Sequence, residues 1–390
     1  MKKSLLVVMP GALELGGVER SLIGLLSSID YDSYDVDLFL YGHHGTLFSM
    51  IDPHVNILPE CRELAHLRES FFDKIKHRCA YSAALRLRDA VHSIFCNVSN
   101  DQTWAQVMRH CTKPLTKHYD AAISFFLPFD FLHERVDAPI KIGWIHTDYS
   151  VEKADFAHLM SQYSRLDIIV AVSEACKESF SSVFPQLASR VIVIENILPA
   201  DFVKKNLQEF SVPCEMPRKG IQLLSVGRFC SAKNFDNVPD ICRRLVADGL
   251  DVKWYLIGYG GDEPLIRQKI DEAGMEDRVI ILGKKDNPYP YMRACDLYVQ
   301  PSRYEGKAVT VREAQMLGKP VVITNYATSG SQLEDGVDGV IVPMDNAGCA
   351  AGIAALLRAP ARMQQLSENC KKRDYTNSAE VEKIYALMED

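Results

Sequence analysis

The stretch that decides the fold is RYEGKAVTVREAQMLGKPVV, residues 303–322. An apolar run ends just before it, and its last residues begin another. Between the two runs the pattern predicts a helix from near Ala308 to Gly318, because glycine commonly ends a helix and proline cannot extend it. One carboxylate, Glu305, then lies at the mouth of this helix, and a second, Glu313, lies two turns inside it. Two buried strands joined by a helix make a parallel βαβ unit.

The same alternation of short apolar runs and helical patterns extends along most of the chain. The runs are apolar on both faces and rich in β-branched residues, as buried parallel strands are. They cover residues 5–9, 36–41, 54–58, 121–126, 141–145, 168–172, 191–194, 222–226, 253–257, 279–282, 297–300, 321–324 and 340–342. This pattern predicts the α/β class with doubly wound sheets, whose ligand sites lie at the carboxyl ends of the strands.

The length of 390 residues exceeds what one ordinary core needs, so we expect two domains. We predict a first domain over residues 1–199 and a second over residues 220–376. Between them, residues 200–219 carry prolines and mixed charges without an apolar period, and we assign them as the linker. Residues 377–390 have apolar side chains at helical spacing and are predicted to form a C-terminal helix.

A helical insert is predicted inside the first domain, at about residues 60–118. From Glu60 to Lys117 there are 10 lysines and arginines against 6 acidic residues, although the whole chain has a net charge of -7. One interpretation is a pair of helices with a solvated basic face. The other is a peripheral contact with an anionic membrane or a lipid-linked acceptor.

Composition narrows the class of protein. Hydrophobic residues make up 47% and charged residues 24%, which is typical of a globular chain, and the negative net charge argues against nucleic acid as a partner. The 11 cysteines include no CxxC pair, so we expect reduced thiols in a cytoplasmic protein. The first apolar run is too short for a signal peptide, and no run has the ~20 apolar residues of a membrane span.

The first half offers two candidate site segments. Gly16 and Gly17 follow the first predicted strand and precede a helix expected to start near Val18, where free N–H groups favour an anion. The alternative is a plain strand-to-helix turn, since the segment matches neither a dinucleotide fingerprint nor a P-loop. His146 follows the predicted strand 141–145 and can hydrogen-bond a substrate hydroxyl there, although a lone histidine is often structural.

The second half adds cations at strand ends. Arg228 and Lys233 follow the strand 222–226, and such a pair suits a diphosphate. The guanidinium of arginine can donate two parallel hydrogen bonds to phosphate oxygens, and the ammonium group of lysine supplies a compact positive charge. The alternative is two solvated surface charges. Lys284 begins the loop that follows the predicted strand 279–282. The exposed backbone of this loop is suited to hydrogen-bonding with the edge of a nucleotide base.

The opening stretch supplies an anion site and two carboxylates. Backbone N–H groups at the start of its helix are predicted to be free for an anion. They belong to Gly306, Lys307, Ala308 and Val309. Glu305 beside them suits the hydroxyls of a polyol, and Glu313 suits a vicinal diol. The alternative for Glu305 is a favourable interaction with the helix dipole, which does not account for Glu313 or the cations.

Together, GGVERS after the first strand, GRFCSAKN opening the second half and the E-x7-E pattern in YEGKAVTVREAQ resemble the retaining glycosyltransferases of family 4. The resemblance implies the GT-B fold, in which two Rossmann-like domains face a cleft and the last helix crosses back to the first domain. The first domain would bind the acceptor and the second the nucleotide-sugar donor.

The resemblance also implies roles for the candidate residues. Arg228 and Lys233 would bind the diphosphate and stabilise the leaving nucleotide, and Glu305 would hold the hydroxyls of the transferred sugar. Glu313 would hold the ribose, and His146 would contact the sugar near the reacting carbon. The remaining donor contacts would come from Gly16, Gly17, Lys284, Gly306, Lys307, Ala308 and Val309. Lys307 and Ala308 depart from the residues frequent in the family after Glu-Gly, which puts the sugar preference in doubt.

The activity implied is retaining transfer of a hexose from a nucleotide sugar, with UDP-sugars favoured, to a saccharide or lipid-linked saccharide in cell-surface or capsule polysaccharide synthesis. No cofactor or metal is expected, and we reject Asp35-Val36-Asp37 as a metal motif because it opens a strand. Two alternatives remain open, a sugar-nucleotide epimerase on the same fold and a non-catalytic sugar-binding assembly component. We expect the protein in the cytoplasm or at the inner face of the membrane.

Overall fold

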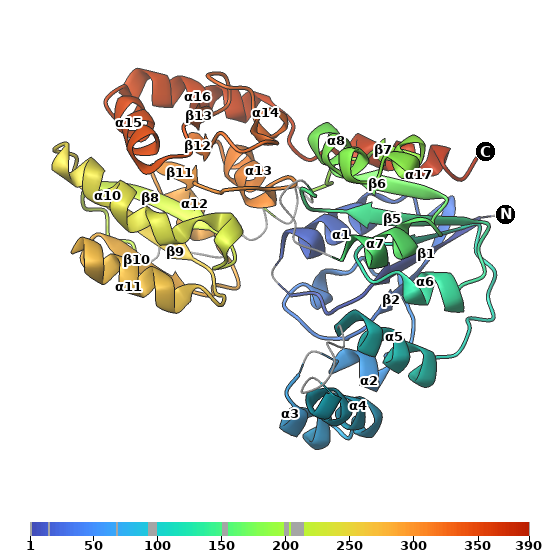
Figure 1. Ribbon diagram of the computed structural model, residues 1–390. Helices are drawn as coiled ribbons and strands as arrows, with labels where there is room; N and C mark the ends of the chain where they lie inside the picture. The colour runs from blue at the N-terminus through green and yellow to red at the C-terminus, as the bar shows by residue number, and fades with distance from the viewer. Residues whose placement is uncertain are drawn as a thin grey trace.

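The computed structural model of the protein describes residues 2–14, 16–67, 69–92, 100–149, 155–198, 203 and 214–389. Figure 1 shows two α/β lobes side by side. We call the described part of residues 2–198, together with residues 378–389, the first lobe, and residues 214–376 the second lobe. The predicted linker, residues 200–219, lies outside the described residues except at residues 203 and 214–219.

The first lobe is built on a seven-stranded sheet with the order β3-β2-β1-β4-β5-β6-β7. All of its recorded strand pairs are parallel. The strands are β1 (Lys3–Met9), β2 (Tyr34–Leu40), β3 (Asn56–Ile57), β4 (Ala121–Ser124), β5 (Ile140–Ile145), β6 (Ile168–Ala171) and β7 (Val191–Val193). β1 is nearly inaccessible to solvent, which its uninterrupted apolar run requires.

The second lobe contains a six-stranded sheet with the order β10-β9-β8-β11-β12-β13, again with parallel pairs. Its strands are β8 (Ile221–Val226), β9 (Val252–Ile257), β10 (Val279–Gly283), β11 (Leu297–Gln300), β12 (Val321–Thr324) and β13 (Val340–Val342). In both sheets the order reverses beside the first strand, as in doubly wound folds, so the predicted α/β class and architecture are confirmed.

Helices connect the strands. In the first lobe they are α1 (Gly17–Ser28), α2 (Arg62–Ala65), α3 (Phe71–Lys76), α4 (Ala80–His92), α5 (Asn100–Cys111), α6 (Asp130–Arg135), α7 (Phe156–Tyr163) and α8 (Glu174–Val183). In the second lobe they are α10 (Val238–Ala247), α11 (Glu263–Ala273), α12 (Tyr289–Ala294), α13 (Val309–Met316), α14 (Ser329–Gln332), α15 (Asn346–Leu357) and α16 (Pro360–Lys372). Helices α2 to α5 occupy the predicted insert and project from the first lobe at the foot of Figure 1.

The C-terminal segment returns to the first lobe, as predicted. Helix α17 (Val381–Ala386) lies beside α8 and β7 in Figure 1. Its buried residues Val381 and Ile384 belong to the core of the first lobe. Tyr385 stacks on Tyr34 with ring centroids 4.3 Å apart, which fixes the helix against β2. Within the described residues, no helix has the length and apolar character needed to cross a bilayer.

Candidate active site

A cleft of about 550 Å³ lies between the two lobes. The residues that line it follow the carboxyl ends of strands from both sheets, where doubly wound folds bind ligands. Among the predicted site residues, the lining includes Gly16, Gly17, His146, Arg228, Lys233, Lys284, Glu305, Lys307, Ala308 and Val309. The topology thus brings together side chains that are nearly 300 residues apart in the sequence.

His146 follows the end of β5 and contributes an imidazole to the cleft. Its Nε2 lies 2.9 Å from the carbonyl oxygen of Phe125. Since a carbonyl only accepts, Nε2 carries the proton and Nδ1 is left as an acceptor. Burial lowers the pKa of the His146 imidazole to about 4, although the Phe125 carbonyl acts against this effect. The ring is therefore neutral at physiological pH and can accept a hydrogen bond from a ligand hydroxyl.

Gly16 and Gly17 lie where α1 begins, and the helix starts at Gly17, one residue before the predicted position. A carboxylate already occupies this end of the helix. Glu19 lies in the first turn, and its Oε2 would be 1.9 Å from a Cβ atom added at Gly16. A side chain at position 16 would displace this carboxylate. The negative charge of Glu19 suits the helix N-terminus, so an incoming anion has to compete with it.

The predicted cations differ in their surroundings. Arg228 is exposed within the cleft lining, beyond the end of β8. Lys233 is partly buried, and its Nζ lies 2.5 and 2.6 Å from the two carboxylate oxygens of Glu305. Glu305 also accepts a hydrogen bond of 2.6 Å from the Ser302 hydroxyl. Lys233 therefore fixes the position of Glu305, while Arg228 is open to a ligand.

The turn before α13 packs closely against the first lobe. A Cβ atom added at Gly306 would lie 2.3 Å from the carbonyl oxygen of His146, so only glycine fits this approach of the two backbones. Helix α13 begins at Val309, one residue later than predicted. The Ala308 N–H donates to Oε1 of Gln332 at 2.7 Å. The prediction that this N–H is free for an anion is therefore wrong, because a side chain from α14 reaches it first.

Glu313 does not line the cleft. Its carboxylate is buried and accepts hydrogen bonds from Nη1 of Arg20 at 2.6 Å and from the Tyr289 hydroxyl at 2.7 Å. Burial raises the pKa of the Glu313 carboxyl. Desolvation by itself would lower the pKa of Arg20, but the charge and hydrogen bond of Glu313 together with the nearby Tyr289 outweigh it and raise that pKa. The structure thus puts Glu313 in an ion pair between α13 and α1, where sequence reasoning expected it to face a ribose.

Further ion pairs join the lobes near the cleft. Lys284 Nζ lies 2.9 Å from Oε2 of Glu14, which follows β1 in the first lobe. Lys307 donates to Oε1 of Glu195, and Arg312 Nη2 lies 2.7 Å from Oε2 of the same carboxylate. Burial, followed by repulsion from Arg312, lowers the pKa of Lys307 to about 8. Burial alone would raise the pKa of Glu195, but Lys307 and Arg312 outweigh it and hold that pKa below its usual value.

Sequence reasoning missed three residues of this site. Arg20 lies within the GGVERS motif, and its helical spacing from Gly16 and Gly17 was a usable signal. Glu195 and Gln332 carry no local signal, because each acts on a segment more than 20 residues away in the chain. Their roles depend on tertiary packing alone.

One family model matches the second half of the chain. The model described as glycosyl transferases group 1 matches residues 209–373, which include nearly all of the second lobe, with Arg228, Lys233, Glu305 and Glu313. The matched residues make up less than half of the chain. The match does not reach the first lobe, so the cleft residues of that lobe are assigned from the geometry described above.

Curated relatives match this chain over part of their length. An alpha-D-kanosaminyltransferase of Streptomyces kanamyceticus is 28% identical over 150 residues, which are 38% of this chain and 39% of the relative. The N-acetylgalactosamine-N,N'-diacetylbacillosaminyl-diphospho-undecaprenol 4-alpha-N-acetylgalactosaminyltransferase of Campylobacter jejuni is 26% identical over 186 residues, 47% of this chain and 48% of the relative. The matched stretches therefore span less than half of these relatives.

Solved structures match the fold over the whole chain. HepE of Anabaena in complex with UDP is 17% identical, covers 99% of both chains and has a TM-score of 0.66. TarM of S. aureus, solved as a point mutant with UDP and saccharide ligands, is 14% identical, covers 100% of both chains and has a TM-score of 0.69. At this identity the likeness establishes the fold, which is the two-domain GT-B architecture.

Proposed function

We propose that the protein is a retaining glycosyltransferase that moves a hexose from a UDP-sugar to a saccharide or lipid-linked saccharide acceptor in cell-surface polysaccharide synthesis. The observation that carries this proposal is the composition of the cleft. Arg228, Lys233 and Glu305 from the second lobe share it with Gly16, Gly17 and His146 from the first. Cations for a diphosphate and polar groups for a sugar therefore lie within one cavity.

In this proposal the protein acts mainly through preorganised charge. Arg228 binds the diphosphate and stabilises the negative charge that develops as the nucleotide leaves. Lys233 shares this task and holds Glu305 in position for the sugar hydroxyls. His146, with Nδ1 as an acceptor, takes a hydrogen bond from a sugar hydroxyl near the reacting carbon. The residues present supply the charge stabilisation themselves, so the transfer requires no metal ion or cofactor.

The choice of donor and acceptor draws on the similar proteins. HepE was solved with UDP and glucose, and TarM with UDP and saccharide ligands. The name of the Campylobacter jejuni relative gives a diphospho-undecaprenol lipid as its acceptor. A further relative from Erwinia amylovora is described as an amylovoran biosynthesis glycosyltransferase. These names favour a UDP-sugar and a surface polysaccharide pathway for the present chain.

Calorimetric titration with UDP, GDP and ADP, with and without EDTA, tests the donor class. We expect UDP to bind most tightly and equally well with EDTA. The variant Arg228→Ala should bind UDP about 10- to 100-fold more weakly, because it loses charge-assisted hydrogen bonds to the diphosphate. Arg243→Ala is the matched control, since Arg243 lies on α10 and pairs with Asp240 outside the cleft.

Absence of binding by all three nucleotides would reject the donor proposal. A product whose anomeric configuration, read by NMR, is inverted relative to the donor would reject the retaining mechanism while leaving the transferase intact. Interconversion of UDP-sugars without an acceptor would favour the epimerase.

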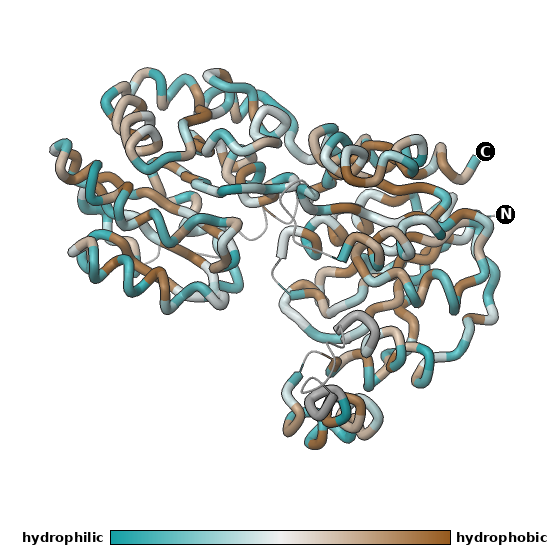
Figure 2. The backbone as a smooth tube through the Cα atoms, viewed as in Figure 1, coloured by the Kyte–Doolittle hydropathy of each residue, from teal (hydrophilic) through white to brown (hydrophobic). Residues whose placement is uncertain are grey.

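We also propose that the insert contacts an anionic membrane through α3. Phe72 and Ile75 on this helix are 80% and 55% exposed, and Leu87 on α4 is 57% exposed. Lys76 and Arg78 are exposed beside them and suit anionic headgroups. Figure 2 shows hydrophobic and hydrophilic residues alternating along the backbone of the insert, at the foot of the view.

Lys74 is not part of this surface, although it is one of the 10 lysines and arginines counted between Glu60 and Lys117. It is 1% exposed, and its Nζ donates to the carbonyl oxygens of His66 and Leu67.

Co-sedimentation with phosphatidylglycerol vesicles tests the proposed contact between α3 and an anionic membrane. Phe72→Asp together with Ile75→Asp should abolish sedimentation, while Leu265→Asp, at an exposed apolar position on α11, should not. Equal sedimentation of all three proteins would reject the proposal.

A further inference from the structure

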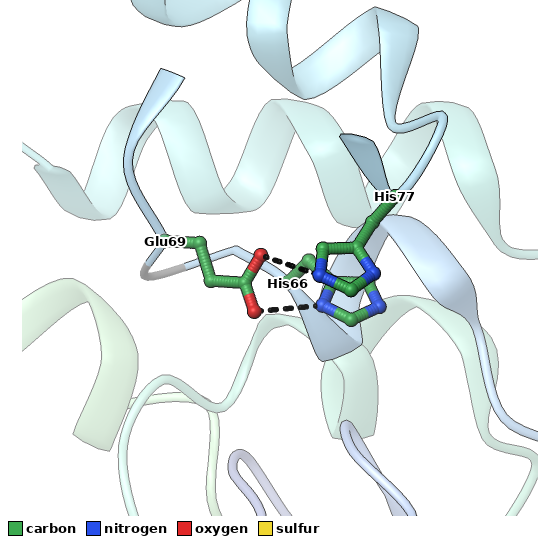
Figure 3. Close-up of side chains that lie close together, drawn as sticks. All are labelled: His66, Glu69 and His77. Carbon is green, nitrogen blue, oxygen red and sulfur yellow. Dashed lines mark hydrogen bonds and ion pairs between the residues drawn. The ribbon is translucent and has the colours of Figure 1, made fainter. Parts of the chain in front are cut away.

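The insert contains a cluster of metal-ligating side chains that the transferase proposal does not use. His66, Glu69 and His77 each offer one ligand atom, and these atoms all lie within 4.8 Å of one another. Figure 3 shows both imidazoles presenting a nitrogen to the same carboxylate, one to each oxygen. The residues come from separate positions, since His66 follows α2, Glu69 lies in the turn and His77 follows α3.

We propose that this cluster is a binding site for a divalent transition-metal ion, with Zn²⁺ as the expected occupant. Two imidazole nitrogens and a carboxylate form a donor set that zinc accepts. Imidazole favours zinc and its neighbours over magnesium or calcium, which prefer oxygen donors. The inference concerns the insert and does not depend on the proposed transfer reaction. None of the three residues lines the cleft, so this ion would not take part in catalysis.

The distances are close to those that a metal requires. Donors bound to one zinc ion at about 2.1 Å stand roughly 3.4 Å apart in a tetrahedral site. His66 Nδ1 lies 3.0 Å from Glu69 Oε1, and His77 Nε2 lies 3.8 Å from Glu69 Oε2. The His77 and Glu69 side chains are 40% and 34% exposed, so they can turn toward an ion without disturbing the core. Their exposure also leaves room for water as a further ligand.

The two imidazole rings stack, with centroids 4.0 Å apart and an angle of 12° between the planes. This stacking places one nitrogen of each ring on the same side, next to the Glu69 carboxylate. A metal ion binds imidazoles in their neutral form and itself supplies the positive charge for the carboxylate.

The surrounding backbone holds the ligands in place. The buried Lys74 donates to the carbonyl oxygens of His66 and Leu67, which fixes the turn that carries the first ligand. Arg78, directly after His77, has φ of +59°, a left-handed conformation that is unfavourable for a non-glycine residue. This turn ends α3 so that His77 lies over His66. An ion at the cluster would clamp both ends of α3, the helix that exposes Phe72 and Ile75.

The test uses the full-length protein after EDTA dialysis, titrated with ZnCl₂ by calorimetry and analysed for bound metal. We expect one high-affinity Zn²⁺ per chain. His77→Ala and Glu69→Gln should each weaken this binding at least 10-fold, since even loss of an outer-shell partner costs about 10- to 100-fold. His110→Ala is the matched control, because His110 lies on α5 in the same insert and stacks on Tyr81 outside the cluster.

Substitution with Co²⁺ provides a second readout. We expect visible ligand-field absorption without a thiolate charge-transfer band, and its loss in His77→Ala. Zinc binding that is unchanged in both His77→Ala and Glu69→Gln would overturn the proposal, as would a thiolate band or failure of the wild type to bind one ion. His77 is exposed, so its replacement should leave the fold intact, which circular dichroism verifies.

Discussion

The buried pair of Arg20 and Glu313 allows a sharp test of how the lobes are held together. The side chains are 6% and 2% exposed, and their contact of 2.6 Å joins α1 to α13. Arg20→Met keeps an apolar stem but leaves the Glu313 carboxylate buried without its cation. Breaking a buried pair in this way costs about 3–5 kcal/mol. Removing both charges in Arg20→Met/Glu313→Met should cost much less, about 1 kcal/mol, because no buried charge remains.

The assay is urea unfolding followed by tryptophan fluorescence. Trp144 and Trp254 lie in different lobes, so a transition in either lobe is visible. The double-mutant cycle, computed for the transition that separates the lobes, should give a coupling energy of at least about 2 kcal/mol. The exposed pair of Arg267 and Glu263 on α11 is the control, for which we expect less than about 1 kcal/mol.

A coupling energy near zero would refute this reasoning. UDP binding by Glu313→Gln then separates the two roles of the carboxylate. If the variant keeps its stability but no longer binds UDP, Glu313 holds the ribose, as the family resemblance implies. If it loses stability and an added excess of UDP restores it, Glu313 holds the lobes together and the nucleotide binds in the cleft without contacting Glu313.

Three further outcomes are expected. Arg228→Met should lower kcat/KM by about 10²–10³-fold in a transfer assay, the usual loss when one charge-stabilising group is removed. The His146 ring, with its pKa of about 4, should show no titration by NMR between about pH 5 and 8. Lys307 has a pKa of about 8 in the folded protein and about 10.5 when unfolded, so the unfolded chain binds more protons between these values. Stability should therefore rise by up to about 3 kcal/mol over that range, and comparison of urea midpoints should show this increment missing in Lys307→Met.

The fold was predictable from the sequence because parallel strands buried on both faces need continuous apolar runs. Strands β11, β12 and β13 have the predicted bounds without change, and the other strands differ by a few residues at their ends. The helix ends at the opening stretch were also predictable, since Gly318 has φ of +66° and a glycine is favoured there. The positions of His146 and Arg228 in the cleft were predictable as well, because both residues follow the carboxyl ends of parallel strands.

The contacts between the lobes were not predictable, because they depend on how two separate sheets face each other. Glu313 illustrates the difficulty. Its place on α13 was correctly derived from the sequence, but its partners Arg20 and Tyr289 lie 293 and 24 residues away. Long-range contacts within the second lobe were equally hard to predict, since the Ala308 N–H donates to Gln332 on another helix. The local sequence pattern predicts which helix or strand carries a side chain, but tertiary packing determines which residues that side chain contacts.

Several positive groups in the cleft are paired with carboxylates. Lys233 is held by Glu305, Lys284 by Glu14, and the N-terminus of α1 faces the carboxylate of Glu19. Each of these is a position where the sequence predicted contact with a donor. Without an anion, unpaired positive groups between the lobes would repel one another and lose solvation, and the carboxylates offset both effects. A diphosphate that enters the cleft exchanges with these partners, so its net affinity is the difference between two sets of ionic contacts. Because Arg228 is exposed and needs no such exchange, it should contribute the largest share of that difference.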